Sequence, residues 1–308
     1  MSVSEVMGRH RNLAMLIGLS LLWGASFLFI KVAVRELTPA TLITGRLGLA
    51  ALTLALLVPF AVGTGATAQQ VRGYWPWLVV VALVNTAIPF WLLSWGETRI
   101  DSGLASIIQA SVPIFNALLI LRFLPHERLT RTQALGLAIG LAGVAVVTGI
   151  HPEGGTMAMV GAFAVVLSSL SYAAGGVYGQ RAVSGTSGPV LAAGSMLVAG
   201  LILLPFALFQ LPTSVPSAEA IASLLALSLL GTALAQLILF RMLALHGSAR
   251  LSLVTYLMPG IALVYGALLL DEAITPATIG GLVLILGGVA LASGSARLSR
   301  REAAAART

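Results

Sequence analysis

The residues best suited to chemistry in this sequence are amides, hydroxyls and prolines placed inside long apolar runs. One such run, SIIQASVPIFNALL at 106–119, contains Ser106, Gln109, Pro113 and Asn116. At 100° per residue these four positions fall within an arc of about 80° on one face of a helix. Polar side chains inside a membrane span usually face a bundle interior or an aqueous cavity. This face is therefore predicted to bind a small polar molecule by hydrogen bonds.

Three prolines in the middle of apolar runs indicate the same kind of surface. Proline has no N–H, and its ring clashes with the carbonyl four residues earlier, which is left without a hydrogen bond. Because an unpaired carbonyl is costly in lipid, it must face protein, water or a bound molecule. Kinks that help curved helices pack are the alternative, and the recurrence of one pattern favours a cavity. The carbonyls belong to Gln109 before Pro113, Thr255 before Pro259 and Asn85 before Pro89.

Further candidates are aromatic and polar side chains on stripes of small residues in other apolar runs. An aromatic ring on such a stripe suits a wall for the apolar part of a substrate, and core packing is an equally good interpretation. These residues complete the predicted substrate-binding surface. They are Trp23 and Phe27 in the first run, Ser168 and Tyr172 in the sixth, Thr232 in the eighth, and Ser252, Thr255, Tyr256 and Pro259 in the ninth.

The composition places these residues in a membrane. The chain is 58% hydrophobic and 9% charged, with a mean hydropathy of +1.00, whereas a soluble domain carries about 25% charge. A spanning helix needs about 20 mostly apolar residues. The predicted fold is an all-α integral membrane bundle of ten transmembrane helices. The expected spans are 13–32, 40–62, 75–95, 102–124, 132–150, 157–178, 189–209, 220–245, 251–270 and 276–296.

The distribution of Lys and Arg predicts the orientation of these spans. With the N-terminus inside, 13 of the 17 basic residues fall in inner segments, three in outer segments and one, Arg46, within the second span. Positive charge concentrates on the cytoplasmic side of membrane proteins, so both termini are expected in the cytoplasm. The first span is too long for the apolar region of a cleavable signal peptide.

Charged residues near the span ends are expected to have peripheral roles. Arg46 lies only a few residues inside the outer end of its span, so its side chain is predicted to snorkel to the outer surface. Lys31 is interpreted in the same way. Glu127 and Glu272 follow the fourth and ninth spans. Each is predicted to cap the helix that comes next in the chain.

No Asp or Glu lies in the interior of a predicted span. Proton-coupled transporters usually need a buried titratable carboxylate or histidine. The absence favours facilitated flux, or coupling through helix-end groups such as Glu97. It also suits a substrate without net charge, because an unpaired fixed charge is costly to bury. The chain has no cysteine, and its four histidines show no ligand spacing, so neither a metal nor another cofactor is expected.

The second half of the chain repeats the first. Sliding 101–149 onto 247–294 pairs serines, prolines, glutamates and threonines in the same order, Pro113 with Pro259 among them. Because each copy has five spans, an odd number, the second copy enters the membrane inverted. Inverted repeats are typical of secondary transporters, with the substrate site near the midplane between the halves. The predicted repeats are 1–150, with the first five spans, and 151–308, with the last five.

Three segments also carry a family resemblance. They are LLWGASFLFIKVAVRELTPATLITGRLGLAAL at 21–52, GLASIIQASVPIFNALL with HERLTRTQALGLAIGLAGVAVV within 103–147, and ARLSLVTYLMPGIALVYGALLLDEAITPATIGGLVLILGGVAL at 249–291. These segments resemble the EamA-type permeases of the drug/metabolite transporter superfamily. The resemblance implies two inverted five-helix repeats, with helices 1, 3, 4, 6, 8 and 9 lining a central cavity. It also implies an exporter of small metabolites in the bacterial inner membrane.

Within this superfamily the amino-acid exporters, YddG-like proteins among them, are the preferred branch. The predicted substrate is a neutral or aromatic amino acid, exported by alternating access. The predicted partners are this small molecule and the lipid bilayer, with no nucleic acid. Export of another small metabolite or a drug-like compound is the alternative. Glycine spacing in the fifth and tenth spans suits close helix packing, within a monomer or in a homodimer.

Two other classes of protein compete with a transporter. The sequence GTSG at 185–188 has the form used by intramembrane serine proteases, but a nucleophilic serine needs a base within hydrogen-bond reach, and no histidine lies within a predicted span. A turn explains these glycines. A channel would need a ring of charges or a filter motif, which the sequence lacks. The protein is therefore not expected to be an enzyme.

Overall fold

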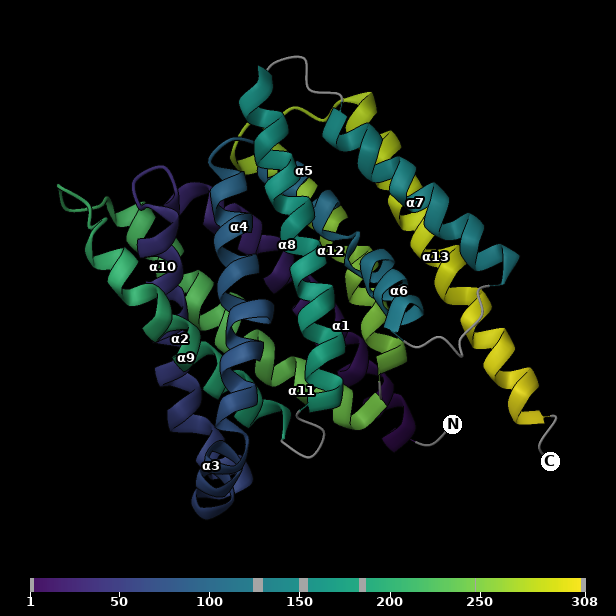
Figure 1. Cartoon of the computed structure of the whole chain (residues 1–308), viewed down its shortest axis with the longest axis horizontal. Coiled ribbons are helices and arrows are strands. Elements are labelled where there is room, and N and C mark those ends of the chain that lie inside the picture. The colour runs from purple at the N-terminus through teal and green to yellow at the C-terminus, as the bar shows by residue number, and fades with distance from the viewer. Residues whose placement is uncertain (1–2, 124–129, 150–154, 183–186, 247, 306–308) are drawn as a thin grey trace.

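The computed structural model consists of helices and their connections over residues 3–123, 130–149, 155–182, 187–246 and 248–305, the part of the chain that the structure describes (Figure 1). Apolar segments form helices because a backbone in lipid must satisfy its own hydrogen bonds. The first half contains α1 (Val3–Ala33), α2 (Pro39–Val62), α3 (Thr64–Val81), the π-helix η1 (Ala82–Ala87), α4 (Ile88–Glu97), α5 (Ser102–Gln109), α6 (Val112–Phe123) and α7 (Arg131–Gly149). The second half contains α8 (Gly155–Ala182), α9 (Gly188–Leu208), α10 (Ala218–Ser228), the π-helix η2 (Leu229–Leu234), α11 (Ala235–His246), α12 (Ser248–Leu269) and α13 (Pro276–Ala305).

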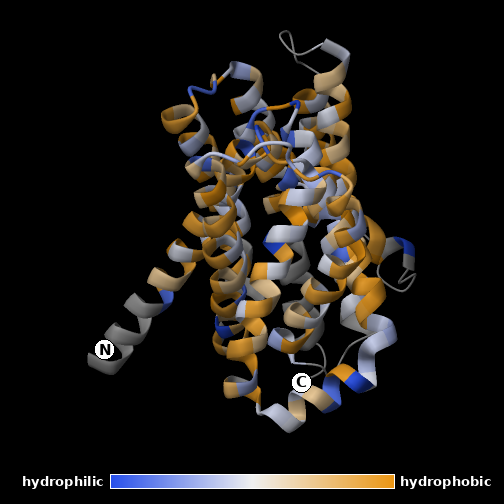
Figure 2. Cartoon of the chain, turned by 90° about the vertical axis from the view of Figure 1, so that its left-hand side faces the viewer, coloured by the Kyte–Doolittle hydropathy of each residue, from blue (hydrophilic) through white to orange (hydrophobic). Residues whose placement is uncertain are grey.

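The helices have the length and polarity of membrane spans. Eight helical segments among the described residues are long and apolar enough to cross a membrane, and shorter apolar stretches at Leu253–Leu269 and Pro276–Ala292 bring the total to ten. Hydrophobic residues dominate the helices (Figure 2). Large ones such as Phe60 and Phe209, each 90% exposed, lie on the outside of the bundle, where lipid would cover them. The protein is a multi-pass membrane protein, and the predicted ten-helix all-α fold is confirmed.

Several spans differ from their predicted extent. α1 begins at Val3 and α13 ends at Ala305, both beyond the predicted spans, and two further differences bear on the site. The third begins at Thr64 rather than near residue 75, directly after Gly63, whose φ of 94° ends α2. The fourth is broken into α5 and α6, and Pro113 lies in the first turn of α6, where its missing N–H costs no helical hydrogen bond. Pro113 therefore starts a helix, whereas Pro259 lies inside the continuous α12.

The two halves pack as inverted repeats should. α2 packs on α9 and α7 packs on α13, and in each pair the two helices hold the same place in their own halves. α1 packs on α12 and on the α10–η2–α11 helix, as α8 packs on α5, α6 and the α3–η1–α4 helix. Each of these contacts has a counterpart in which the halves exchange roles, which is what a pseudo-twofold axis in the membrane plane produces.

Glycines bring α7 and α13 together, backbone to backbone. A Cβ added to Gly136 would lie 2.6 Å from the backbone nitrogen of Ala292, and one added to Gly288 would lie 2.5 Å from that of Gly140. Small residues allow such close approach of helices in membranes. The glycine spacing of the fifth and tenth spans thus serves packing within the chain, in the pair of helices at the right of Figure 1.

The bundle has two ends, which we name by their place in Figure 1. The upper end holds the α1–α2, α4–α5 and α12–α13 connections, and the lower end holds the N-terminus and the α2–α3 connection. At the upper end, Nζ of Lys31 donates hydrogen bonds to the backbone carbonyls of Glu97, at 2.9 Å, and Ile100, at 2.6 Å. Lys31 therefore anchors the α4–α5 connection, where the sequence had predicted a side chain reaching the surface.

Glu272, also at the upper end, caps a helix of the other repeat. Its carboxylate oxygens accept hydrogen bonds from the backbone N–H groups of Ser102, at 2.8 Å, and Gly103, at 3.0 Å, and from the Ser102 hydroxyl, at 2.9 Å. A carboxylate suits the positive end of a helix. The prediction that Glu272 caps the helix after it is wrong, because Thr275 accepts the N–H of Thr278 there. Glu127, its predicted counterpart, lies outside the described residues.

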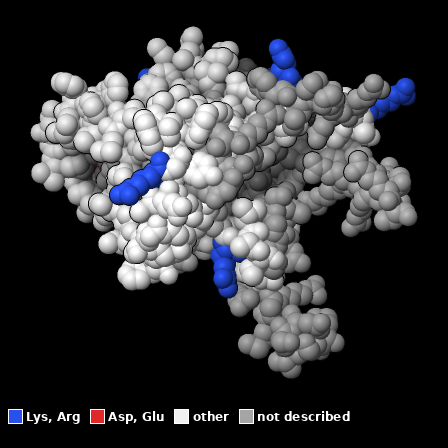
Figure 3. Space-filling model, turned by 60° about the horizontal axis from the view of Figure 1, so that its bottom comes forward, with Lys and Arg blue, Asp and Glu red and all other residues white. Residues whose placement is uncertain are grey.

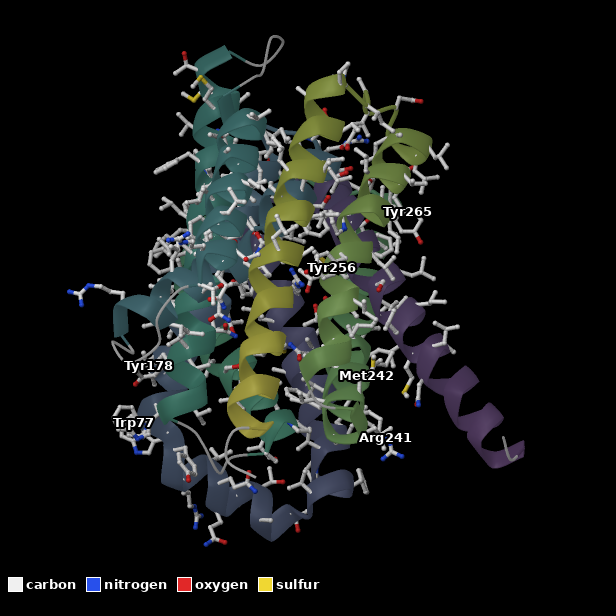
Figure 4. All side chains as sticks on the ribbon, turned by 90° about the vertical axis from the view of Figure 1, so that its right-hand side faces the viewer. Trp77, Tyr178, Arg241, Met242, Tyr256 and Tyr265 are labelled. Atoms are coloured by element: carbon white, nitrogen blue, oxygen red, sulfur yellow. The ribbon has the colours of Figure 1, made fainter. Side chains whose placement is uncertain are left out.

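The lower end carries basic and aromatic side chains. In Figure 3, which brings this end forward, Lys and Arg side chains stand out and no Asp or Glu of the described residues is visible. Arg241 of α11 projects from the bundle, and Trp77 and Tyr178 approach each other (Figure 4), with ring centroids 6.2 Å apart. Basic loops are typical of the cytoplasmic side of membrane proteins, and aromatic rings of both interfaces.

Candidate functional site: a central cavity

A cavity of about 610 Å³ lies between the two repeats. Ile30, Arg46 and Leu93 line its upper part, and Leu191 and Phe240, near the lower ends of their helices, line its lower part. The α4–α5 connection held by Lys31 covers it from above. The cavity therefore extends from the upper third of the bundle toward the lower end.

Eight of the predicted substrate-binding residues line this cavity. They come from both repeats, as the pairing of polar stripes on the fourth and ninth spans required. Their contact with a substrate stays a prediction, but the fold brings them to one place. They are Trp23, Phe27, Asn85, Gln109, Pro113, Tyr172, Thr232 and Thr255.

Six predicted residues are not part of the cavity wall. Ser106 is fully buried, and its hydroxyl donates to the carbonyl of Gly103 at 2.6 Å. The hydroxyl of Ser168 donates to the carbonyl of Pro89 at 2.8 Å. The side chain of a seventh, Ser252, lies outside the described residues. The six are Pro89, Ser106, Asn116, Ser168, Tyr256 and Pro259.

Serines of α8 bind backbone carbonyls of the first repeat. Besides Ser168, the hydroxyl of Ser171 donates to the carbonyl of Val84 in η1 at 2.6 Å, and that of Ser169 donates to the carbonyl of Ile108 at 3.3 Å. A π-turn and a helix break both disturb the regular ladder of hydrogen bonds, and every carbonyl in lipid needs a donor. These contacts give the hydroxyl of Ser168 a structural role that requires no substrate.

Tyr256 faces a different hollow from the rest of its predicted stripe. It lies with Leu21, Ile261 and Tyr265 along a groove of about 390 Å³ between α1 and α12. Figure 4 shows Tyr256 and Tyr265 on α12. Consecutive helix positions point 100° apart, so Thr255 reaches the central cavity while its neighbour does not. Tyr256, predicted to bind substrate together with Thr255, thus lies outside the central cavity.

Each repeat carries a π-helix in the wall of the cavity. η1 interrupts the third span and η2 the eighth, and these spans are equivalent in the two repeats. π-helices are rare and frequently mark functional sites. Here they present Asn85 and Thr86 from one repeat and Gly231 and Thr232 from the other. A π-helix differs from an α-helix by one extra residue per turn, and hydropathy does not change with it. The two π-helices were therefore not predicted from the sequence.

Arg46 is the only charged side chain in the wall among the described residues. It is 6% exposed, its Nε donates to Oγ1 of Thr232 at 2.9 Å, and its guanidinium carbon lies 4.0 Å from the centre of the Phe90 ring. The prediction that it snorkels to the surface is wrong, because Ile43 and Leu47 on the same face of α2 are fully buried. Its depth of about 10 Å below the start of α2 was the available signal.

The cavity can bind a molecule but is not equipped to break bonds. Aromatic rings such as Phe27 and Tyr172 offer apolar surface, and the amides of Asn85 and Gln109 offer donors and acceptors. No cluster of metal-ligating side chains is found in the described part of the chain. Of the GTSG motif, 185–186 lies outside that part, and the backbone N–H of Ser187 donates to Oε1 of Gln70 near the lower end.

Comparison with known proteins points to a membrane transporter. The EamA-like transporter family matches residues 11–149 and again 159–294. A "Probable terminal-alkyne amino-acid exporter" of Streptantibioticus cattleyicolor is 30% identical, over 91% of this chain and 93% of its own. A "Probable amino-acid metabolite efflux pump" of Escherichia coli is 26% identical, over 87% and 89%. A crystal structure with 19% identity and a TM-score of 0.66, covering 94% of this chain and 98% of its own, shows the likeness of fold.

Inverted repeats around a central cavity define a membrane transporter of small molecules. The family match extends over most of both halves of the chain, and several relatives are named as transporters, exporters or efflux pumps. The chain belongs to the EamA-like transporter family. It is a transporter and not an enzyme, and its natural surroundings are lipid and a small-molecule substrate.

Proposed function

We propose that this protein exports neutral or aromatic amino acids across the bacterial inner membrane by alternating access. The observation that carries the proposal is the central cavity, whose wall combines aromatic rings with amide and hydroxyl groups. Its volume lies within the range of small-molecule sites, about 300–1,000 Å³. The relatives named as amino-acid exporters support this substrate class.

The lower end is assigned to the cytoplasm, together with both termini. The face at this end shows Lys and Arg side chains and no Asp or Glu of the described residues, in accord with the positive-inside rule (Figure 3). At the upper end, Lys31 of α1 binds the carbonyls of Glu97 and Ile100, and Glu272 of the second repeat binds the N-terminus of α5, so the two repeats are held together there. We take this arrangement as the inward-facing form, which would take up substrate from the cytoplasm. Export requires the contacts at the upper end to open.

A neutral amino acid matches the wall of the cavity group by group. Its apolar side chain would rest against Trp23, Phe27 and Tyr172, which bury apolar surface. Its ammonium group would donate to the amide oxygens of Asn85 and Gln109. Both kinds of contact form in the middle of the bundle, where the two repeats meet. A rocking motion of the repeats can therefore expose the same contacts to either side.

Counterflow in proteoliposomes tests this proposal. Vesicles loaded with unlabelled phenylalanine should accumulate external labelled phenylalanine or leucine with saturable kinetics, and labelled lysine or glutamate should not accumulate. Tyr172→Ala should lower the flux, whereas Tyr265→Ala, on the outer groove, should not. Accumulation of a drug-like compound with no amino-acid counterflow would establish the alternative substrate class. Flux that does not saturate would indicate a channel.

A further inference from the structure

Arg46 is a buried cation without an acidic partner. Its one hydrogen bond is to Thr232, and no carboxylate of the described residues pairs with it, although Glu97 acts on it at longer range. Buried charges in proteins are normally paired, because an uncompensated charge is costly to remove from water. The cavity beside Arg46 has no Asp or Glu among its described lining residues. The partner is therefore to be sought in what the cavity binds.

The guanidinium of Arg46 is held in one orientation. Thr232 accepts its Nε hydrogen, Phe90 stacks on its face, and Tyr172 supports Phe90 with ring centroids 5.8 Å apart. A guanidinium presents its N–H groups in a planar fork that matches a carboxylate with two parallel hydrogen bonds. With Nε engaged and the face covered, the two Nη groups are the ones left to meet a ligand.

We propose that Arg46 binds the carboxylate of the transported molecule through its two Nη groups, so that the substrate is a monocarboxylate. This inference rests on the proposed function and names the group by which the cavity recognises its substrate. The lining residues described here include no second cation, so a dicarboxylate would carry one charge unpaired into an apolar site.

Competition against phenylalanine counterflow tests the inference on the unaltered protein. 3-Phenylpropionate should compete, because it keeps the carboxylate, while phenylalaninamide and phenethylamine should compete about 100-fold more weakly. Equal competition by the amide overturns the carboxylate site and leaves amino-acid transport standing. If no amino acid shows counterflow, the proposed function fails. Stabilisation of the detergent-purified protein by 3-phenylpropionate then tests the carboxylate site without transport, and no stabilisation overturns it.

Variants of Arg46 test the same point from the protein side. Arg46→Gln should weaken phenylalanine binding about 100-fold, and Arg46→Lys, which keeps the charge but not the fork, about tenfold. Both variants should bind phenylalanine and phenylalaninamide with nearly equal affinity. A purely structural role of Arg46 would weaken both ligands alike and leave the ratio of their affinities unchanged. Arg46→Lys serves alone if Arg46→Gln does not fold. The control is Arg99→Gln, because Arg99 also stacks on a ring, Trp95 at 3.5 Å, but lies outside the cavity. An unchanged ratio in the Arg46 variants overturns the proposal.

Glu97 carries a second inference, on independent observations. It is the last residue of α4, it is 0% exposed, and neither carboxylate oxygen has a hydrogen-bond partner among the described residues. Leu93, one turn earlier on the same face, lines the cavity. Lys31 binds the backbone carbonyl of Glu97 and not its carboxylate. By contrast, the exposed Glu36 accepts the N–H and hydroxyl of Ser217, which lower its pKa.

The charged groups that face Glu97 come from three other elements. They are Lys31 of α1, Arg46 of α2 and Glu272 of the α12–α13 connection, and Tyr172 of α8 acts in turn on Arg46. Glu272 is already occupied by the N-terminus of α5. A carboxylate with no hydrogen bond is costly to bury when ionised and much less so when protonated. The closed upper end thus favours a neutral Glu97.

We infer that Glu97 binds a proton when the upper end closes and releases it when the upper end opens to water. The proton comes from the outer solution and returns to it, so the step balances with no further reactant. Low external pH supplies that proton, so acidification should hold the carrier inward-facing and slow export, by the linkage of proton binding to conformation. The device would tie export to the acidity of the outer solution.

Cysteine labelling tests this inference without any substrate. The chain has no cysteine, so Ile100→Cys, at a position 4% exposed in the α4–α5 connection, can report opening to a membrane-impermeant maleimide added at the upper end. Thr98→Cys, at an exposed position two residues earlier, corrects for the pH dependence of the thiol itself. The ratio of the two labelling rates should fall several-fold on external acidification. With Glu97→Gln it should be low and independent of pH.

Two further variants complete this test. Glu219→Gln removes an exposed carboxylate at the same end and should keep the full pH profile. Glu97→Asp keeps a carboxyl group, should retain a pH dependence, and replaces Glu97→Gln if that variant does not fold. A ratio that is flat in the parent protein, or that follows pH equally in Glu97→Gln, overturns the inference.

Discussion

Two crossings of a long helix with a π-helix border the cavity, and they are built in opposite ways. Where α8 crosses η1 the glycine is on the long helix, and a Cβ added to Gly175 would lie 2.5 Å from Cβ, 2.7 Å from Cα and 2.9 Å from N of Asn85. Where α1 crosses η2 the glycine is on the π-helix, and a Cβ added to Gly231 would lie 2.5 Å from the hydroxyl oxygen of Ser26. The first crossing is limited by backbone, the second by a side chain.

This difference shows that the two repeats share the same arrangement of helices but present different side chains to the cavity. The first crossing brings the amide of Asn85 to the cavity, and the second brings Thr232, which holds Arg46. The first repeat also supplies Arg46 itself and Gln109, so the charge and two of the amides come from one side. A substrate with one charged end and one apolar end needs a wall that is itself asymmetric.

The largest expected effect distinguishes the two glycines. Gly175→Ala should lower the free energy of unfolding by about 3 kcal/mol, because the backbone atoms of Asn85 cannot move aside. Gly231→Ala should cost at most about 1 kcal/mol, because the Ser26 side chain can rotate away. Thermal unfolding of detergent-purified variants measures both. The double variant Ser26→Ala/Gly231→Ala should recover the loss, and equal losses at the two glycines would show that the crossings are alike.

The next effect compares the threonines of the two π-helices. Thr232→Val removes the acceptor of a buried Arg46 N–H, which costs about 1–3 kcal/mol and should raise the half-saturation concentration of counterflow about tenfold. Thr86→Val is the matched control, because Thr86 lines the cavity from η1 and has no bond to Arg46. Its half-saturation concentration should change by less than about twofold. Equal changes would mean that both π-helices serve the substrate alike.

The smallest effect concerns two glutamines in the wall. Oε1 of Gln109 lies 3.4 Å from each of the hydroxyl oxygens of Ser168 and Ser169, whereas Oε1 of Gln236 is buried without a partner among the described residues. Gln109→Leu should destabilise the protein by about 1 kcal/mol, and Gln236→Leu should be neutral or slightly stabilising, because it removes an unsatisfied acceptor. Unfolding midpoints of the two variants decide the order, and the reverse order would contradict the comparison.

Sequence reasoning succeeded where a residue's surroundings are set by its own helix. Lipid acts on each segment separately, so the second span, predicted at 40–62, forms Pro39–Val62. Periodicity likewise placed Gln109 and Pro113 on the face that meets the cavity. Both inferences needed only the order of residues along one helix.

The same reasoning failed where surroundings come from the other repeat. Arg46 is held inside the bundle by Thr232 of η2 and Phe90 of α4, and its own helix gives its depth but not these partners. Glu97 ends a span, which suggested an accessible group, but the packed upper end buries it completely. Ser168 lies on a polar stripe, yet its hydroxyl is taken by a carbonyl of the first repeat. Each error concerns a partner distant in the chain.

The paired π-helices also bear on the history of the chain. A π-turn holds one residue more than an α-turn, so it corresponds to a single insertion into a helix. η1 begins at residue 82 and η2 at residue 229, a separation of 147 (229 minus 82), and both end with the same separation. One insertion in an ancestral five-helix chain accounts for both, whereas two later insertions would have had to fall at matching positions. A pair of such short chains, assembled in opposite orientations, would already have enclosed a cavity bordered by two π-helices before their genes were joined.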